Sequence, residues 1–271
     1  MYALLMAPSG GAALELGQGL LQGEVRVELS EAHARQRSDL QSEQRIEELW
    51  AAKLATNPRM FDASKFRLAD MELVDGRLTL RIGLTSYKDY VGTNLRPEVE
   101  LRTLIARGES ALGGGWAGRS AHLGGALGVE TLLLTADTPP GMVLLRRSSA
   151  VATHQGQYNG PSGHPEPAHA GLDAWPGTKG GAAEPSEAEQ STLAEIFSSV
   201  LQETHEETNI PLDALNPPRL IGAMAELPGL KPDLLFLTST SLTCVYSRLQ
   251  SWLTASRDVC TLAAHHRHTG R

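Results

Sequence analysis

Apolar residues recur along the chain at two different spacings, and the spacing predicts which segments are strands and which are helices. Residues 24–29 (EVRVEL) alternate apolar and charged side chains, as a half-buried strand does. Residues 42–55 place apolar side chains three and four positions apart, which predicts a helix with Ser42 as its N-cap. The dipeptide Asn57-Pro58 predicts the end of this helix.

Further alternating or continuously apolar segments predict more strands. Residues 65–74 and 77–84 flank an Asp-Gly turn, the pattern of a β-hairpin. Residues 129–136 and 142–148 flank the breaker DTPPG and predict a second strand pair. Two more apolar segments predict strands later in the chain, residues 219–227 and 234–246.

Changes in composition predict the domain organisation. The glycine-rich residues 108–128 predict a link between two parts of the protein. We expect one domain at 1–115 and a second at 116–271. A stretch rich in Gly, Pro, Ala and Glu, at about 168–191, predicts a mobile insertion in the second domain.

An acidic helix is expected after this insertion, from residues 191–192 to Asn209. One of its faces is mostly apolar, and on the neighbouring face Glu203, Glu206 and Glu207 fall within an arc of about 100°. Like charges at these spacings repel, and the helix dipole disfavours anions at a C-terminus. The common explanation is a solvated acidic surface, but a divalent cation such as Mg²⁺ would turn the repulsion into attraction.

Composition narrows the functional classes. The chain has 271 residues, of which 41% are hydrophobic and 20% charged, so most of it should fold. Its net charge of −7 argues against a nucleic-acid or anionic-membrane partner. The two cysteines form no disulfide framework and no zinc motif, and the longest apolar runs are of strand length. We therefore expect an intracellular, cytoplasmic protein.

A loop before the acidic helix adds groups that can bind phosphate. Residues 161–167 (PSGHPEP) combine a glycine, His164, which can donate to a phosphate oxygen, and the carboxylate of Glu166. They follow a predicted strand that ends in Arg146 and Arg147. A metal held by the helix would neutralise phosphate oxygens and lower the pKa of an attacking water. Loop and helix together predict metal-assisted hydrolysis of a diphosphate.

The loop and the helix resemble the Nudix box, with Gly163 as its leading glycine and residues 202–210 (QETHEETNI) as its closing segment. Four residues match the box: Glu203, Glu206, Glu207 and Ile210. Three positions depart from it: His169 replaces the first glutamate, Gln202 the arginine and Asn209 the last glycine. The insertion also breaks the usual spacing.

Five blocks in this order resemble the vertebrate Nudix-type UDP-glucose pyrophosphatase family: FDASKFRL (61–68), GLTSYKDYVGTN (83–94), LLRRS (144–148), GHPEP (163–167) and EIFSSVLQE (195–203). The resemblance covers residues 24 to 243, and relative to the family the C-terminus is shortened or altered. It implies an α/β fold of the α+β type, a Nudix αβα sandwich with an N-terminal, mainly β subdomain. In this interpretation residues 1–115 are the substrate-binding subdomain and residues 116–271 the Nudix hydrolase domain. The implied reaction is Mg²⁺-dependent hydrolysis of UDP-glucose and UDP-galactose to UMP and sugar 1-phosphate.

The resemblance also implies roles for individual residues. Glu203 and Glu207 match the magnesium ligands of the family, and Glu206 is a third catalytic candidate. The implied substrate-binding residues are Phe61, Tyr87, Arg147, Ala152, Asn159, His164 and Glu166. Asn159 stands where the family has an aspartate, and an aromatic face such as those of Phe61 and Tyr87 suits a uracil ring.

Two other functions stay open at this point. The missing box glutamate and Gln202 are compatible with a UDP-sugar-binding module that has no catalytic activity. The box does not select a base, so a Nudix enzyme for another substrate, such as ADP-ribose or coenzyme A, also fits. Without the resemblance, Phe61 and Tyr87 would most simply be core aromatics beside a hairpin.

Overall fold

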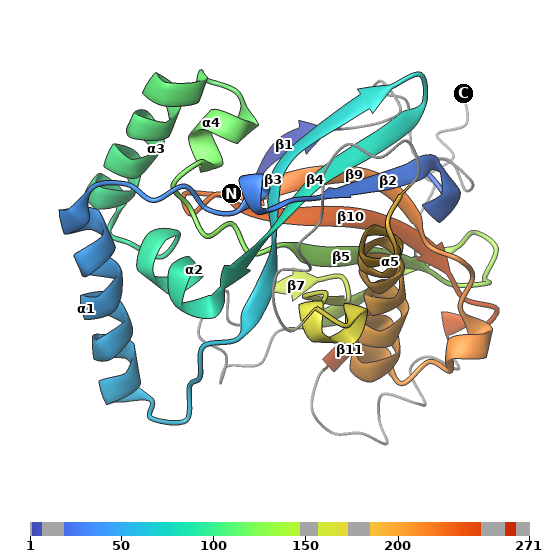
Figure 1. The fold of residues 1–271 in the computed structure, drawn as a ribbon. Helices are drawn as coiled ribbons and strands as arrows, with labels where there is room; N and C mark the ends of the chain where they lie inside the picture. Colours follow the sequence, from blue (N-terminus) through green and yellow to red (C-terminus); the bar gives the residue numbers. More distant parts are fainter. Residues whose placement is uncertain (1, 7–18, 147–156, 173–184, 245–257, 264–271) are drawn as a thin grey trace, which may run out of the picture.

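The computed structural model describes residues 2–6, 19–146, 157–172, 185–244 and 258–263, which form two sheets and the helices around them (Figure 1). The larger sheet has the order β1-β9-β10-β5-β6-β11, with β7 paired to β6 and β8 paired to β5. Its strands are β1 Tyr2–Met6, β5 Gly128–Leu134, β6 Gly141–Arg146, β7 Tyr158–Asn159, β8 Ser162–Gly163, β9 Arg219–Glu226, β10 Lys231–Ser239 and β11 Asp258–Ala263. The expected mixed α/β fold is confirmed.

The smaller sheet has the order β2-β4-β3 and contains the hairpin predicted at the Asp-Gly turn. Its strands are β2 Val25–Leu29, β3 Ser64–Val74 and β4 Arg77–Ser86. Asp75 and Gly76, between β3 and β4, have φ angles of 48° and 75°. Two successive residues with positive φ suit a two-residue hairpin turn, so the prediction is confirmed.

Five α-helices lie among the described residues: α1 Leu40–Thr56, α2 Tyr87–Thr93, α3 Glu98–Leu112, α4 Trp116–Ser120 and α5 Glu187–Thr208. Short 3₁₀ helices lie at Gln22–Glu24, Glu31–His33, Pro167–Ala170 and Leu212–Ala214. The end of α3 and all of α4 lie in the glycine-rich residues 108–128, and α1 and α2 precede that segment.

Two predicted helix starts are wrong, and in each case a cap lies earlier in the chain. Asp39, rather than Ser42, caps α1, and its Oδ1 accepts a hydrogen bond from the backbone N–H of Ser42 at 2.8 Å. Ser186 caps α5 in a reciprocal box with Glu189, so this helix begins before residues 191–192. The predicted C-cap of α5 is confirmed, because Asn209 is left-handed with φ 59°.

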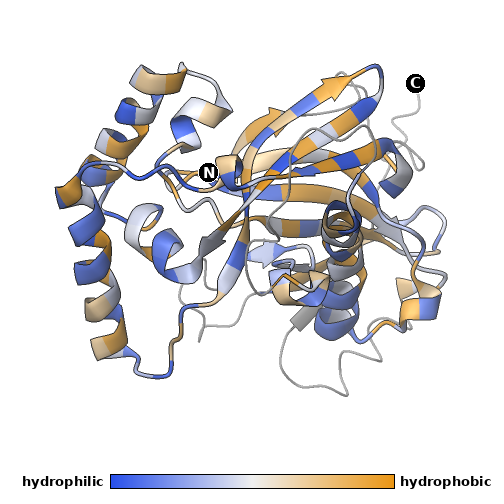
Figure 2. Cartoon of the chain, in the orientation of Figure 1, coloured by the Kyte–Doolittle hydropathy of each residue, from blue (hydrophilic) through white to orange (hydrophobic). Residues whose placement is uncertain are grey.

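The core lies between the two sheets and α5. Figure 2 shows the central strands of the larger sheet mostly in the hydrophobic colours. The predicted apolar face of α5 is buried here, with Ile196 and Val200 at 0% exposure. Phe197 of this face meets Phe236 of β10 edge to face, with ring centroids 5.1 Å apart. This packing fixes the rotation of α5 and so determines which carboxylates point at the neighbouring loop.

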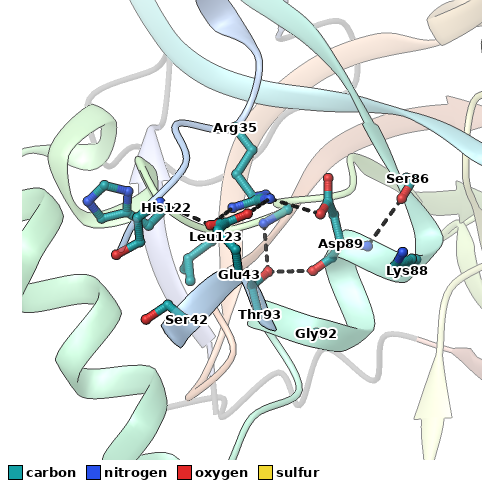
Figure 3. A network of polar contacts seen from close by, with 12 residues as sticks. Arg35, Ser42, Glu43, Ser86, Lys88, Asp89, Gly92, Thr93, His122 and Leu123 are labelled. Carbon is teal, nitrogen blue, oxygen red and sulfur yellow. Dashed lines mark hydrogen bonds and ion pairs between the residues drawn. The ribbon is translucent and has the colours of Figure 1, made fainter. Parts of the chain in front are cut away.

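A network of charged side chains ties the segment before α1 to α1 and α2 (Figure 3). A nitrogen of the Arg35 guanidinium lies 2.7 Å from the Glu43 carboxylate and 3.1 Å from that of Asp89. The hydrogen bond from Arg35 is the main reason that the pKa of Glu43 falls to about 2. The network holds α2, which carries Tyr87 and Tyr90, against α1.

We expect the substitution Glu43→Gln to destabilise the protein at pH 7 by about 1–2 kcal/mol, a value reduced for the partial solvent exposure of the carboxylate. The folded pKa of Glu43 is about 2 against an ordinary 4.5, so its contribution is complete above pH 4.5 and is lost as the pH falls towards 2. Urea unfolding of the wild type and the variant at pH 7 and pH 3 measures this. A difference in unfolding free energy that did not narrow at pH 3 would contradict the prediction.

The last described strand was not predicted from the sequence. Residues 258–263 form β11, which pairs antiparallel with β6. This segment lacks the apolar alternation from which the other strands were predicted. Among the described residues, no helix has both the length and the apolar character that crossing a membrane requires.

Candidate active site

A cavity of about 790 Å³ lies where β5, β8, β10, α2 and the last turns of α5 meet. Polar side chains line the sheet side and the α5 side, and aromatic side chains line the wall formed by α2 and the segment before β3. The volume suits a ligand of nucleotide size. The predicted residues Phe61, Tyr87, Asn159, His164 and Glu207 all line this cavity.

Three carboxylates of α5 accept hydrogen bonds from the loop that contains β8. Glu207 Oε2 accepts from the backbone N–H of residue 162 at 3.0 Å, and Glu203 Oε1 accepts from that of residue 164 at 3.3 Å. Glu195 Oε1 accepts from the N–H of residue 166 at 2.9 Å. Alternate residues of an extended segment point the same way, and residues 195, 203 and 207 share one helix face. The spacing of the amides along the loop therefore matches the spacing of the carboxylates along the helix face, and three amides contact three carboxylates.

Gly163, between two of these amides, is in close contact with Glu203. A Cβ atom at this position would overlap the Glu203 carboxylate. Gly163 also pairs with Val129 of β5, so the backbone cannot easily move away. The leading glycine of the predicted box therefore makes room for a carboxylate that was predicted to bind metal.

We expect Gly163→Ala to lower the activity by about 10- to 100-fold, because the new methyl group displaces Glu203 from the loop. Gly114→Ala is the matched control, since no atom lies within 4 Å of a Cβ built there. Steady-state kinetics of the two variants, with melting temperatures to establish folding, test this. Equal activity of both variants would contradict the expected displacement.

The aromatic wall is built from the segment before β3 and from α2. Phe61 is 74% exposed and lines the cavity, so it is not a core residue. Tyr87 lies in a stacked arrangement with Tyr90 at a centroid distance of 6.2 Å and meets Trp50 edge to face at 6.0 Å. Trp50 belongs to α1 and is buried. The tyrosine pair is therefore fixed by packing, while Phe61 is accessible to a ligand.

Two lysines face the cavity, and each forms an ion pair with a carboxylate. Lys65 contacts Glu166, and Lys231 contacts Asp233. Burial and the charges of both lysines lower the pKa of His164 to about 3. The imidazole is therefore neutral near pH 7, with one nitrogen able to donate a hydrogen bond and the other able to accept one.

The remaining predicted residues differ in whether they reach the cavity. Asn159 donates through Nδ2 to the hydroxyl of Ser162 at 3.0 Å, and Glu166 reaches the cavity wall only through its partner Lys65. Glu206 is exposed and does not line the cavity, because the loop contacts the face of α5 that carries Glu203 and Glu207. Arg147 and Ala152 lie outside the described residues.

Several residues at the site were missed from the sequence. Glu195 is 9% exposed and also lies 3.3 Å from Nδ1 of His169, the residue in place of the first box glutamate. Other missed residues share one feature, a charge within or next to an apolar strand: Lys65, Glu130, Glu226, Lys231 and Asp233. That feature is readable in the sequence and is the signal that could have identified them.

The residues present fit a hard divalent cation. Glu207 lines the cavity, and Glu203, one helical turn away, does not line it but lies against Gly163, which does. In the described part of the chain, no cluster of three or more His, Cys, Asp or Glu side chains could hold a metal ion. Mg²⁺ commonly takes one or two carboxylates and completes its coordination with water and substrate phosphate, so two suffice.

Comparisons with known proteins give the family. The chain is 38% identical over 233 residues to human uridine diphosphate glucose pyrophosphatase NUDT22, covering 84% of this chain and 72% of that protein. The mouse protein of the same name is 36% identical, with 89% and 72% covered. Nudix hydrolase 9 of Arabidopsis thaliana is 30% identical, with 84% and 73% covered.

No protein-family model matches the chain. A solved Nudix hydrolase from M. Smegmatis, RenU, is 11% identical with a TM-score of 0.26, and the match covers 50% of this chain and 68% of that one. The family assignment depends on the sequence relatives. The chain belongs to the family of Nudix hydrolases that includes uridine diphosphate glucose pyrophosphatase NUDT22.

Proposed function

We propose that the protein hydrolyses UDP-glucose to UMP and glucose 1-phosphate with Mg²⁺, and that UDP-galactose is a second substrate. The observation that carries the proposal is the contact of Glu203 and Glu207 with the β8 loop at the edge of a cavity of nucleotide size. The relatives of 36–38% identity bear the name of this activity and support the choice of substrate.

Glu203 and Glu207 would hold the cation. Bound there, Mg²⁺ supplies charge neutralisation for the diphosphate and lowers the pKa of water. The backbone amides of residues 162 and 164 each occupy one carboxylate oxygen and so orient the carboxylates.

The other groups of the cavity would bind and orient the substrate. His164, neutral near pH 7, donates one hydrogen bond without adding charge, and Lys65 adds a positive charge beside it. Phe61 and Tyr87 offer aromatic faces to the uracil ring. The partly enclosed cavity keeps both ends of an extended substrate in contact with protein.

Incubation with UDP-glucose in the presence of Mg²⁺ tests the proposal, with UMP release as the readout. The control is a double variant, Glu203→Gln with Glu207→Gln, which keeps side-chain size and the amide contacts but removes both charges. We expect release of UMP by the wild type only, and its loss with a chelator. A wild type no faster than the double variant contradicts hydrolysis, and a rise in melting temperature without turnover would indicate a UDP-sugar-binding module instead.

A further inference from the structure

A second group of charged residues faces the cavity at a distance from the carboxylates of α5. Glu226 ends β9, Lys231 begins β10, and Asp233 lies two residues further on the same face. Asp233 is 8% exposed within a strand whose following residues, Leu234 and Phe236, are fully buried. A buried carboxylate in an apolar strand is costly, so its presence beside a cavity requires an explanation.

The neighbouring strand makes room for this group. Gly128 of β5 is the register partner of Asp233, and a Cβ atom there would overlap both the Asp233 carboxylate and the Lys231 ammonium. Lys231 is also the register partner of Glu226 across the β9–β10 hairpin. Glycine at residue 128 thus lets an ion pair lie flat on the sheet, in a space that any other side chain would fill.

The position of the group fits one end of the proposed substrate. Strand β10 is separated from β8 by β5 alone, so the backbones of the two strands lie two strand spacings, about 10 Å, apart. Asp233 is the register partner of Gly128, which precedes Val129, the register partner of Gly163. The spacing of the two strands suits a group attached directly to a diphosphate held at α5. Phe61 and Tyr87 lie on the other wall, formed by α2 and the segment before β3.

The chemistry of the group fits a polyhydroxylated ligand. Each sugar hydroxyl donates one hydrogen bond and accepts others, and here carboxylates accept while an ammonium donates. Tyr90 lies beside them with its pKa raised, first by burial and then by the charges of Glu226 and Asp233. Its phenol therefore keeps its proton and can donate. A uracil ring, flat and with a single N–H, matches the aromatic wall better.

We propose that Glu226, Lys231 and Asp233, accommodated by Gly128, form the subsite that binds the hexose of the nucleotide sugar. The inference rests on the proposed function, since it assumes a diphosphate held near Glu203 and Glu207. It assigns substrate selection to the β9–β10 hairpin, outside the Nudix-box residues. Removing one acceptor from a site built for hydroxyls should weaken binding of the sugar while the nucleotide contacts stay intact.

The test compares UDP-glucose with UDP, which has the same base, ribose and diphosphate but no hexose. For Glu226→Gln we expect kcat/KM for UDP-glucose to fall by about 10- to 100-fold, while the Kd for UDP stays within about threefold of the wild-type value. Asp233→Asn is the second variant, with a melting temperature because it breaks an ion pair. Glu98→Gln, an exposed carboxylate on α3, is the matched control.

The outcomes separate the subsite from the proposed hydrolysis. A Glu226→Gln variant that loses affinity for UDP and UDP-glucose equally would place the group against the nucleotide and overturn the subsite. Unchanged constants for both ligands would also overturn it. If the wild type binds UDP-glucose without turnover, the proposed hydrolysis is wrong. The Kd values of each variant for UDP and for UDP-glucose would still test the subsite.

Discussion

Replacing Glu207 by glutamine is expected to lower kcat for UDP-glucose by about 1,000-fold, equivalent to about 4 kcal/mol of transition-state stabilisation. Glu207 lines the cavity, and its Oε2 accepts the hydrogen bond from the Ser162 N–H at 3.0 Å. Glutamine keeps this acceptor and the side-chain size but removes the charge that a cation needs. Steady-state kinetics at several Mg²⁺ concentrations would show the loss, with near-UV circular dichroism to establish an intact fold.

Two variants on the same helix make this result specific. Glu187→Gln, in the exposed first turn of α5, is the control and should leave kcat unchanged. Glu206→Gln tests which face of α5 the reaction uses, because Glu206 is exposed and does not line the cavity. We expect less than a threefold change for Glu206→Gln. A loss as large as that of Glu207→Gln would mean that the reaction uses the other face of α5.

Arg67→Leu is expected to cost about 3–5 kcal/mol of unfolding free energy. Arg67 is 3% exposed, and its guanidinium donates to three backbone carbonyls, those of His33 at 2.8 Å, Ser120 at 2.7 Å and Leu123 at 3.1 Å. Burial lowers its pKa to about 10, so it is still charged at neutral pH. Leucine would leave three buried carbonyls without these donors. Urea unfolding should show a lower midpoint at an unchanged m-value.

Arg81→Leu on the adjacent strand β4 provides the comparison. Arg81 pairs with Asp70 and Glu72 at the surface of the small sheet. Exposed ion pairs of this kind contribute about 0–1 kcal/mol, so this variant should unfold close to the wild-type midpoint. If the two arginine variants lost equal stability, the three buried carbonyl contacts of Arg67 would not be the cause.

The sequence predicts well what depends on neighbours along the chain. The Asp75-Gly76 hairpin, the left-handed cap at Asn209 and the apolar face of α5 all follow from local pattern and are found in the structure. The wrong helix starts at Ser42 and at residues 191–192 have a local cause as well. In both cases an earlier capping residue was overlooked because the apolar periodicity begins only later.

What the sequence did not predict depends on contacts between distant segments. Strand β11 pairs with β6 across more than a hundred residues, and its own pattern carries no signal. The helical arc that contains Glu203, Glu206 and Glu207 could not show which of them meet the loop, since that depends on the docking of α5 in the core. Glu195 was missed because its partner, the backbone amide of residue 166, lies in a loop whose position against α5 is set by the fold.

Because Glu195 accepts a hydrogen bond from the residue 166 amide, the contact between α5 and the loop does not depend on the length of the connection that precedes the helix. Leu172, at the end of the loop, is 4% exposed and packs in the same core as Ile196 of α5. Both ends of the connection from Leu172 to Glu187 are therefore held by contacts of their own. Doubling its length would cost only about 0.6 kcal/mol in closure entropy. A longer or shorter connection between Leu172 and Glu187 should therefore leave the carboxylates of the helix in their positions on the loop.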